Sequence, residues 1–157
     1  VRTETRVDAV LGSPPGFVPD VVALGRAVNA AKRERVIAAI RSRNPHLRVV
    51  DGMAPITALL VAQVQEAITV PDSAERLVER AMFESAGNRV VLHLSRAALV
   101  EVTMHRLDPL YRAHELRVFD GQLGPGRHNL PIAGRVGRGE RYVVVRGDGQ
   151  TAVRREG

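Results

Sequence analysis

The sequence contains no cysteine and no tryptophan, and only 3% of its 157 residues are aromatic. The absence of cysteine excludes disulfide bonds, thiolate nucleophiles and cysteine-ligated zinc sites. The scarcity of aromatic residues requires a core built from Val, Leu, Ile and Ala, and it leaves few large side chains of the kind that anchor protein interfaces. With 45% hydrophobic and 25% charged residues, the chain still has the composition of a globular protein.

Long apolar runs are missing as well. No stretch reaches the roughly 18 apolar residues that a membrane-spanning helix needs, and the opening VRTETRVDAVLGSPPG lacks the apolar centre of a signal peptide. We therefore expect no transmembrane segment. All but one of the 23 basic residues are arginine. This bias is typical of a GC-rich bacterial genome, so the abundance of arginine does not by itself indicate a function.

The positive charge is concentrated in the second half of the chain. Residues 1–85 contain 11 basic and 10 acidic residues, whereas residues 86–157 contain 12 basic and 7 acidic residues. Any affinity for a polyanion should therefore lie in the second half. The candidate contacts for a polyanion or another partner are the arginines from residue 127 onward: Arg127, Arg135, Arg138, Arg141, Arg146, Arg154 and Arg155.

The first half has mainly helical patterns. Residues 2–11 alternate in a way that predicts a strand with one wet face, and residues 19–45 have a helical period. A short strand is expected over residues 46–52. The apolar run over residues 54–68 predicts a central helix that is packed on all sides, and residues 71–88 predict a further helix.

Capping signals accompany these predicted helices. Asp20 is the expected N-cap of the first helix, and Asn44-Pro45 is its expected stop. Pro55 should lie near the first turn of the apolar helix. Asp72, followed three residues later by Glu75, resembles a capping box for the last helix.

The second half has the pattern of a β-protein. Five short runs are β-branched or alternating and are separated by Gly, Pro and Asp, which favours an antiparallel sandwich or a small barrel. In the second run Val100, Val102 and Met104 should face inward, while the residues between and after them, Glu101, Thr103 and His105, should face water. The five runs are residues 89–95, 98–107, 114–119, 127–134 and 141–147.

Two stretches of this half carry a family resemblance. LSRAALVEVTMHRL, followed by ELRVFDGQLGPGRHNLPIAGRVGRGERYVVVRGDGQ, resembles the bacterial immunoglobulin-like module of the flagellar hook-cap (FlgD-type) family. The shared features are a strand leading into L-x-P-G-x-H, a loop containing glycine and a last G-x-x-Y strand, and they span residues 89–152. The resemblance implies a non-catalytic sandwich that serves as an attachment or spacer module in extracellular and cell-envelope proteins.

Arg146-Gly147-Asp148 is a tripeptide that integrin ligands display on hairpin tips. Asp148 and Gly149 both tolerate the left-handed backbone that a tight reverse turn requires. We therefore expect a hairpin turn between YVVV and TAVRR. Display of the tripeptide to a receptor is the alternative.

The chain has no catalytic or metal motif that can be recognised by spacing. His93 and His105 lie on neighbouring predicted strands, but a metal site needs three or four ligands, and no HxH or HExxH spacing is present. No serine lies in a GxSxG elbow. The glycine-rich stretch at residues 134–140 joins two strands and does not lead into a helix that could hold a phosphate. We assign no catalytic residue, cofactor or metal.

These patterns predict an α+β protein in two parts. Residues 1–86 should form a helical part with one or two strands, and residues 87–157 an antiparallel immunoglobulin-like β-sandwich. The leading function is a non-enzymatic structural or adhesive interaction module of a bacterial exported or cell-surface assembly, with a protein partner or self-assembly. The first alternative is a basic nucleic-acid-binding protein, which would be cytoplasmic and would use the arginine-rich C-terminal β half. The second alternative is an enzyme of unknown reaction.

Overall fold

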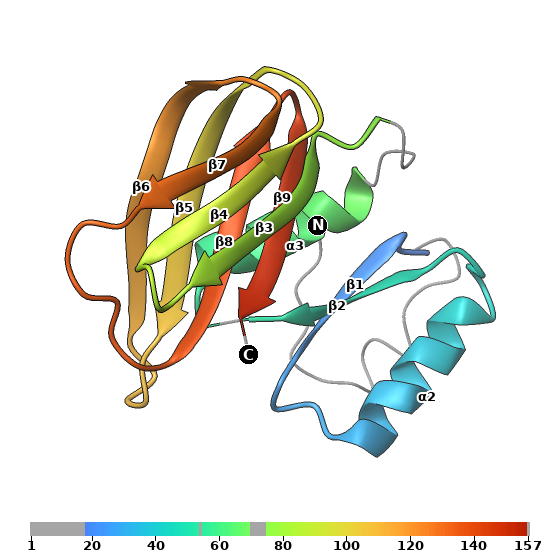
Figure 1. The fold of residues 1–157 in the computed structure, drawn as a ribbon. Coiled ribbons are helices and arrows are strands. Elements are labelled where there is room, and N and C mark those ends of the chain that lie inside the picture. Colours follow the sequence, from blue (N-terminus) through green and yellow to red (C-terminus); the bar gives the residue numbers. More distant parts are fainter. Residues whose placement is uncertain (1–17, 54, 70–74, 157) are drawn as a thin grey trace. The chain divides into compact units, whose positions relative to one another are not determined.

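A computed structural model of the chain describes residues 18–53, 55–69 and 75–156 (Figure 1). The fold is mixed α/β, with mostly antiparallel sheets in a sandwich-like arrangement. This agrees with the predicted combination of helices and an antiparallel sandwich. The chain divides into two compact units, Val1–Ala54 and Pro55–Gly157. The boundary expected near residue 86 instead lies in the turn between two paired strands of the second unit. The strand expected over residues 2–11 lies outside the described residues.

The first unit is a small βαβ arrangement. Strand β1 (Val21–Gly25) pairs in parallel with β2 (Arg48–Gly52), and helix α2 (Ala30–Arg41) connects them. The strand expected over residues 46–52 is confirmed as β2. The buried core of this unit consists of aliphatic side chains from the strands, the helix and the segment before β2, namely Leu24, Val36, Ile40 and Leu47.

The helix expected from Asp20 is wrong in its first part, which forms β1. The carbonyl of Asp20 accepts a hydrogen bond from the Arg48 amide at 2.9 Å, next to the β1–β2 ladder. The N-cap of α2 is Asn29, whose side chain accepts from the Lys32 amide at 2.9 Å. The β-branched pair Val21-Val22 suits a strand when a parallel partner such as β2 is present. The spacing of apolar residues, from which the helix was predicted, contains no information about that partner.

The second unit begins with helix α3 (Thr57–Ile68) and continues with seven strands. The strands form a three-stranded sheet, β3-β4-β7, and a four-stranded sheet, β6-β5-β8-β9, with every neighbouring pair antiparallel. The sheets enclose a core of apolar side chains. The strands are β3 (Val78–Glu84), β4 (Arg89–Leu94), β5 (Ala98–Leu107), β6 (Ala113–Leu123), β7 (Gly126–Pro131), β8 (Glu140–Gly147) and β9 (Gln150–Glu156).

Helix α3 packs against β8 and β9, on the side of the four-stranded sheet that faces away from the three-stranded sheet (Figure 1). The side chain of Glu66 on α3 lies 2.6 Å from Arg154 on β9. Leu59 is fully buried, whereas Val61 is 48% exposed and Ile68 is 61% exposed. The apolar helix is therefore confirmed, but it is not packed on all sides. No helix of the described ranges is both long enough and apolar enough to span a membrane.

The helix expected over residues 71–88 is contradicted by strand β3. Its ladder with β4 has an irregularity between Val78 and Arg80. Glu79 is therefore an extra residue, with no residue opposite it on β4. Because of this bulge, Val78 and Ala81 both face the core although they are three residues apart. The helix was expected from the capping-box-like pair Asp72 and Glu75 and from Gly87-Asn88 as its end, and such signals contain no information about a strand partner such as β4. Asp72 lies outside the described residues.

Strand β5 is buried on both faces over its second half. Val100, Val102 and Met104 face the core, as predicted. Thr103 and His105 were expected to face water, but they are only 2% and 1% exposed. The prediction was wrong because it assumed a sheet with one wet face, whereas this sheet is also covered on its outer face.

We expect Leu59→Ala to destabilise the protein by about 2–5 kcal/mol, because it removes a buried side chain of α3 and leaves a cavity. Val61→Ala is the matched control, because Val61 lies two residues further along α3 and is 48% exposed. It should lower the free energy of unfolding by less than about 1 kcal/mol. Urea unfolding followed by circular dichroism measures both. Equal losses for the two variants would show that α3 is not anchored by the face that carries Leu59.

Candidate functional site

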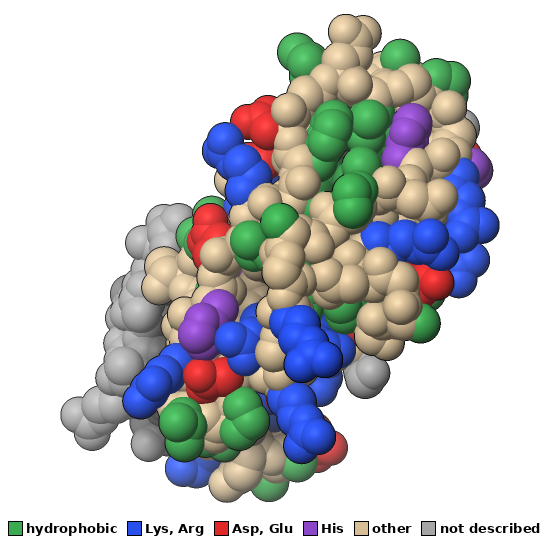
Figure 2. Space-filling view, turned by 60° about the vertical axis from the view of Figure 1, so that its left-hand side comes forward, with side chains coloured by type: hydrophobic (Ala, Val, Ile, Leu, Met, Phe, Trp, Pro, Cys, Tyr) green, Lys and Arg blue, Asp and Glu red, His purple; other side chains and the backbone are tan. Residues whose placement is uncertain are grey.

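The seven candidate arginines are spread over different parts of the sandwich. They lie on β7 (Arg127), on the loop between β7 and β8 (Arg135, Arg138), on β8 (Arg141, Arg146) and on β9 (Arg154, Arg155). Neighbouring residues on a strand point to opposite faces, so a cluster in sequence is divided between faces. Figure 2 shows that both Lys and Arg side chains and hydrophobic side chains reach the surface.

Arg141 has a structural role at one end of the core. Its guanidinium carbon lies 5.1 Å from the centroid of the Phe83 ring, which is a cation–π distance. Its Nη2 donates to the carbonyl of Gly137 at 3.2 Å, and its Nε is buried. The side chain thus joins the β7–β8 loop to the edge of the core, and it does not present its charge to a partner.

Three further candidates are paired with carboxylates. Arg146 lies 3.7 Å from Glu101, Arg154 lies 2.6 Å from Glu66, and Arg155 lies 3.9 Å from Glu140. Ion pairs that are still partly open to water contribute little to stability. Each carboxylate nevertheless offsets the charge of its arginine. The attraction of β8 and β9 for a polyanion is therefore weaker than their arginine content suggests.

The remaining candidates, Arg127, Arg135 and Arg138, are exposed and have no ion pair with another described residue. Arg127 lies beside His93 in the three-stranded sheet. Arg138 lies beside the end of β5, where its carbonyl accepts from Arg106, and Arg135 follows Gly134, whose carbonyl accepts from Asn88 in the β3–β4 turn at 2.7 Å. Arg135 and Arg138 are thus exposed cations that share one loop.

The β7–β8 loop is held closely against the end of β5. Arg106 Nη1 donates to the carbonyl of Arg138 at 2.8 Å. Gly139 has a φ of +135°, and a Cβ atom at this position would lie 2.1 Å from the carbonyl oxygen of Leu107. Only glycine permits so close an approach of the two backbones. The loop and the β5–β6 hairpin thus form one fixed end of the sandwich.

The tip of the β5–β6 hairpin carries two exposed apolar side chains that the sequence analysis did not select. Leu110 is 70% exposed and Tyr111 is 77% exposed. Tyr111 has a φ of +59°, a left-handed conformation that is rare for a bulky residue. The sequence signal was available in LDPLYR, where two large apolar residues follow an Asp-Pro turn.

Asp108 holds this tip in place. Its Oδ1 accepts from the amides of Leu110 and Arg112 at 2.9 and 2.8 Å, and its Oδ2 lies 3.0 Å from Nε2 of His114. The hydrogen bond from the Arg112 amide, followed by that with His114, keeps the pKa of the Asp108 carboxyl below its usual range. The tip is therefore preorganised by a charged side chain.

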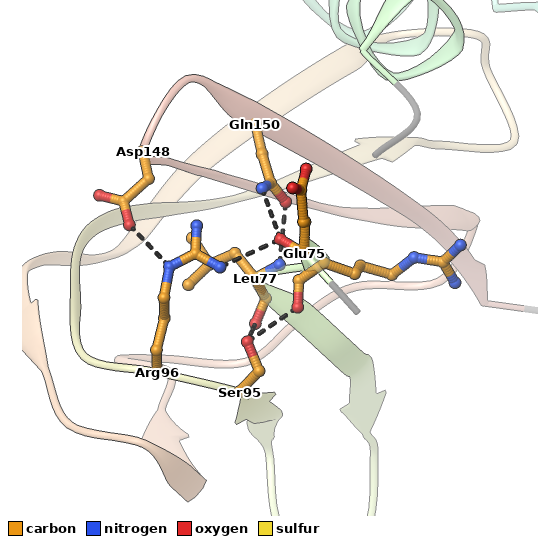
Figure 3. A network of polar contacts seen from close by, with 7 residues as sticks. Glu75, Leu77, Ser95, Arg96, Asp148 and Gln150 are labelled. Atoms are coloured by element: carbon orange, nitrogen blue, oxygen red, sulfur yellow. Dashed lines mark hydrogen bonds and ion pairs between the residues drawn. The ribbon is translucent and has the colours of Figure 1, made fainter. Parts of the chain in front are cut away.

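The Arg146-Gly147-Asp148 tripeptide lies at the predicted hairpin turn, which is confirmed between β8 and β9. Asp148 and Gly149 have φ values of +48° and +72°. Asp148 Oδ2 accepts from Nε of Arg96 at 3.3 Å, as Figure 3 shows. Arg146 lies against Glu101 on β5. Both charged side chains of the tripeptide thus have partners within the chain.

The turn belongs to a polar network that joins three segments (Figure 3). Arg96 Nη1 and Gln150 Nε2 both donate to the carbonyl of Glu75, at 3.0 and 2.8 Å. Gln150 Oε1 accepts from the Leu77 amide at 2.9 Å, and Ser95 donates to the carbonyl of Arg76 at 2.8 Å. These contacts fix the start of β3 to the β8–β9 turn, which is a structural role.

The histidines do not form a metal site among the described residues, where no group of three His, Asp or Glu ligands occurs. His93 lies 2.6 Å from Glu79 on the three-stranded sheet, while His105 is buried on the four-stranded sheet. Both ring nitrogens of His105 lack a hydrogen-bond partner, and Glu115 lies 3.6 Å from Nδ1. Burial lowers the pKa of His105 below its usual range, although Glu115 opposes this effect and Arg146 adds to it.

Comparison of the chain with known protein families, with curated proteins and with solved structures finds no match. The chemistry and geometry of the chain's own residues are therefore the basis for any assignment of function.

The buried His105 predicts a loss of stability in acid. Because its pKa is lower in the folded state, the unfolded chain binds the proton more readily, and stability falls as the pH drops below about 6.5. His105→Leu removes the proton-binding group and should flatten the pH dependence of unfolding between about pH 7.5 and 5.5. His46→Leu, at an exposed position, is the control and should retain the wild-type slope. An unchanged slope in His105→Leu would contradict the assignment.

Gly139→Ala should destabilise the sandwich by more than about 2 kcal/mol, because the new Cβ would overlap the Leu107 carbonyl at a backbone angle that disfavours side chains. Gly124→Ala is the control, since no atom lies within 4 Å of a Cβ placed there. Thermal unfolding of both variants tests this expectation. Equal stability of the two variants would mean that the β7–β8 loop is not held against β5.

Proposed function

We propose that the chain is a non-enzymatic structural or interaction module of a bacterial exported or cell-surface assembly, and that its second unit is an immunoglobulin-like sandwich. The order of the strands carries this proposal. The first, second and fifth strands of the sandwich form one sheet, and the fourth, third, sixth and seventh form the other. A division of seven antiparallel strands between two facing sheets in this way is typical of immunoglobulin-like and fibronectin-like modules.

The residues that carry the sequence resemblance support the same proposal through their structural positions. Gly124-Pro125-Gly126 lies at the crossing from β6 to β7, and Nε2 of His128 lies 2.8 Å from the carbonyl of Gly124. In the G-x-x-Y element, Gly139 lies against β5 and Tyr142 is buried, with its hydroxyl 3.1 Å from Glu140. These residues maintain the fold. Modules that share a fold but differ in what they bind have such structural residues in common.

The contacts of the basic residues favour this proposal over the nucleic-acid alternative. Arg141 caps the core, and three other candidate arginines face carboxylates. Phosphate binding depends on cations that can replace the counterions of the nucleic acid. Binders of single strands also use several stacking aromatics, whereas Tyr111 is the one aromatic residue of the sandwich that is more than a third exposed.

Size-exclusion chromatography with light scattering should detect self-assembly at both about 50 and 500 mM salt, without nucleic acid, since apolar contacts tolerate salt. Addition of mixed DNA and RNA should leave the elution unchanged. Arg135→Gln/Arg138→Gln serves as the matched variant and should assemble normally. Co-elution with nucleic acid at low salt only, lost in this double variant, would replace the proposal with the nucleic-acid alternative. A monomer under every condition would contradict self-assembly.

A further inference from the structure

We propose that the end of the sandwich formed by the β5–β6 hairpin and the β7–β8 loop attaches the module to the surface of an anionic phospholipid bilayer. Leu110 and Tyr111 enter the interface between water and hydrocarbon. Arg112, Arg135 and Arg138 contact the phosphate groups around them. This end is called the hairpin end below.

The apolar part of the hairpin end projects from the fold. The loop between β5 and β6 lies at one extremity of the sandwich in Figure 1, and its two large side chains are 70% and 77% exposed. Exposed apolar residues that stand next to each other on a projecting turn lose unfavourable hydration when they enter a bilayer interface. Tyrosine is enriched at this depth, because its ring is apolar and its hydroxyl stays hydrated.

The tip is held in the exposed conformation before it binds. The Asp108 carboxylate accepts from two amides of the loop, and the Tyr111 amide donates to the Asp108 carbonyl at 2.9 Å. The backbone at Tyr111 is left-handed, and both apolar side chains are exposed in this conformation. Binding therefore requires little further ordering of the loop, which lowers its entropic cost.

The cations of the hairpin end complement an anionic surface. Arg112 lies on the hairpin, and Arg135 and Arg138 lie on the loop that Arg106 and Gly139 hold against it. These three are exposed and have no ion pair with another described residue. Of the nearby carboxylates, Asp108 accepts hydrogen bonds within the hairpin, and Glu140 lies 3.9 Å from Arg155. Each cation near an anionic leaflet strengthens binding about fivefold.

The geometry favours a bilayer over two other partners. A nucleic acid would require several aromatic platforms, and leucine cannot stack with a base. A protein partner usually buries about 800 Å² per side, much more than two side chains on a narrow turn supply. A lipid surface requires only shallow insertion and surrounding cations, and one apolar signal combined with a basic one is sufficient for reversible attachment. The inference rests on the proposed function in one respect, since it places the module at a cell envelope.

Because the chain has no tryptophan, Tyr111→Trp introduces a unique fluorophore at the tip. Its emission should shift to shorter wavelength when vesicles of phosphatidylglycerol and phosphatidylcholine are added, and not with phosphatidylcholine alone. The shift should weaken as salt is raised from about 50 to 500 mM, because screening acts on the arginine contacts. Leu99→Trp is the matched control, since Leu99 is also 70% exposed but lies at the opposite end of β5. It should show no shift.

Vesicle co-sedimentation tests the individual side chains. Leu110→Ser/Tyr111→Asn should reduce binding to anionic vesicles, whereas Leu99→Ser should not; asparagine tolerates the left-handed conformation at residue 111, so the fold is preserved. Arg112→Gln/Arg138→Gln should reduce binding about 25-fold, because each cation contributes about fivefold. The pair Arg80→Gln/Arg127→Gln removes the same charge from the three-stranded sheet and should retain most of the binding.

Three outcomes would overturn the inference: no binding of the wild-type chain to anionic vesicles, equal losses in the tip and control variants, or binding of an oligonucleotide and not vesicles through Arg112 and Arg138. Failure of the inference can be distinguished from failure of the proposed function. Self-assembly measured without lipid would persist if only the membrane attachment is wrong, and it would be absent if the structural function itself is wrong.

Discussion

The packing of two β-sheets against each other over an aliphatic core is the interaction on which the second unit depends. Val90 and Leu92 from one sheet and Val102, Val143 and Val145 from the other are fully buried. These side chains hold the two sheets together and fix the positions of the turns that connect the strands. In a sandwich such turns usually carry the specificity of binding.

The strands of this sandwich could largely be predicted, and the errors have local causes. Alternation identified β4, β5, β6, β7 and β8, because one face of each contacts the same core. A capping-box-like pair before β3 suggested a helix where the chain forms a strand. The parallel partner that makes Val21-Val22 a strand lies 27 residues away. Helix α3 was visible in the sequence, but the burial of both faces of β5 was not, so Thr103 and His105 were assigned to the wrong environment.

The candidate surface was harder to predict, because the role of an arginine depends on what lies next to it. Sequence gives Arg138 and Arg141 the same charge and nearly the same position. In the fold Arg141 lies over Phe83, whereas Arg138 contributes its carbonyl to a contact with Arg106 and leaves its own side chain exposed. Leu110 and Tyr111 were overlooked for the opposite reason, since apolar residues are expected in a core and only the structure shows that these two lie outside it.

The arginines of the hairpin end are thus of two kinds, structural and exposed, and the exposed ones depend on the structural ones. Arg106 and Arg141 donate to carbonyls of the β7–β8 loop, and in this way they fix the backbone that displays Arg135 and Arg138. The strained backbone at Tyr111 is tolerated because Asp108 and the adjoining ladder of β5 and β6 determine its conformation from both sides. An exposed tip of this kind is stable only on a rigid support. The aliphatic core supplies that support without itself taking part in binding.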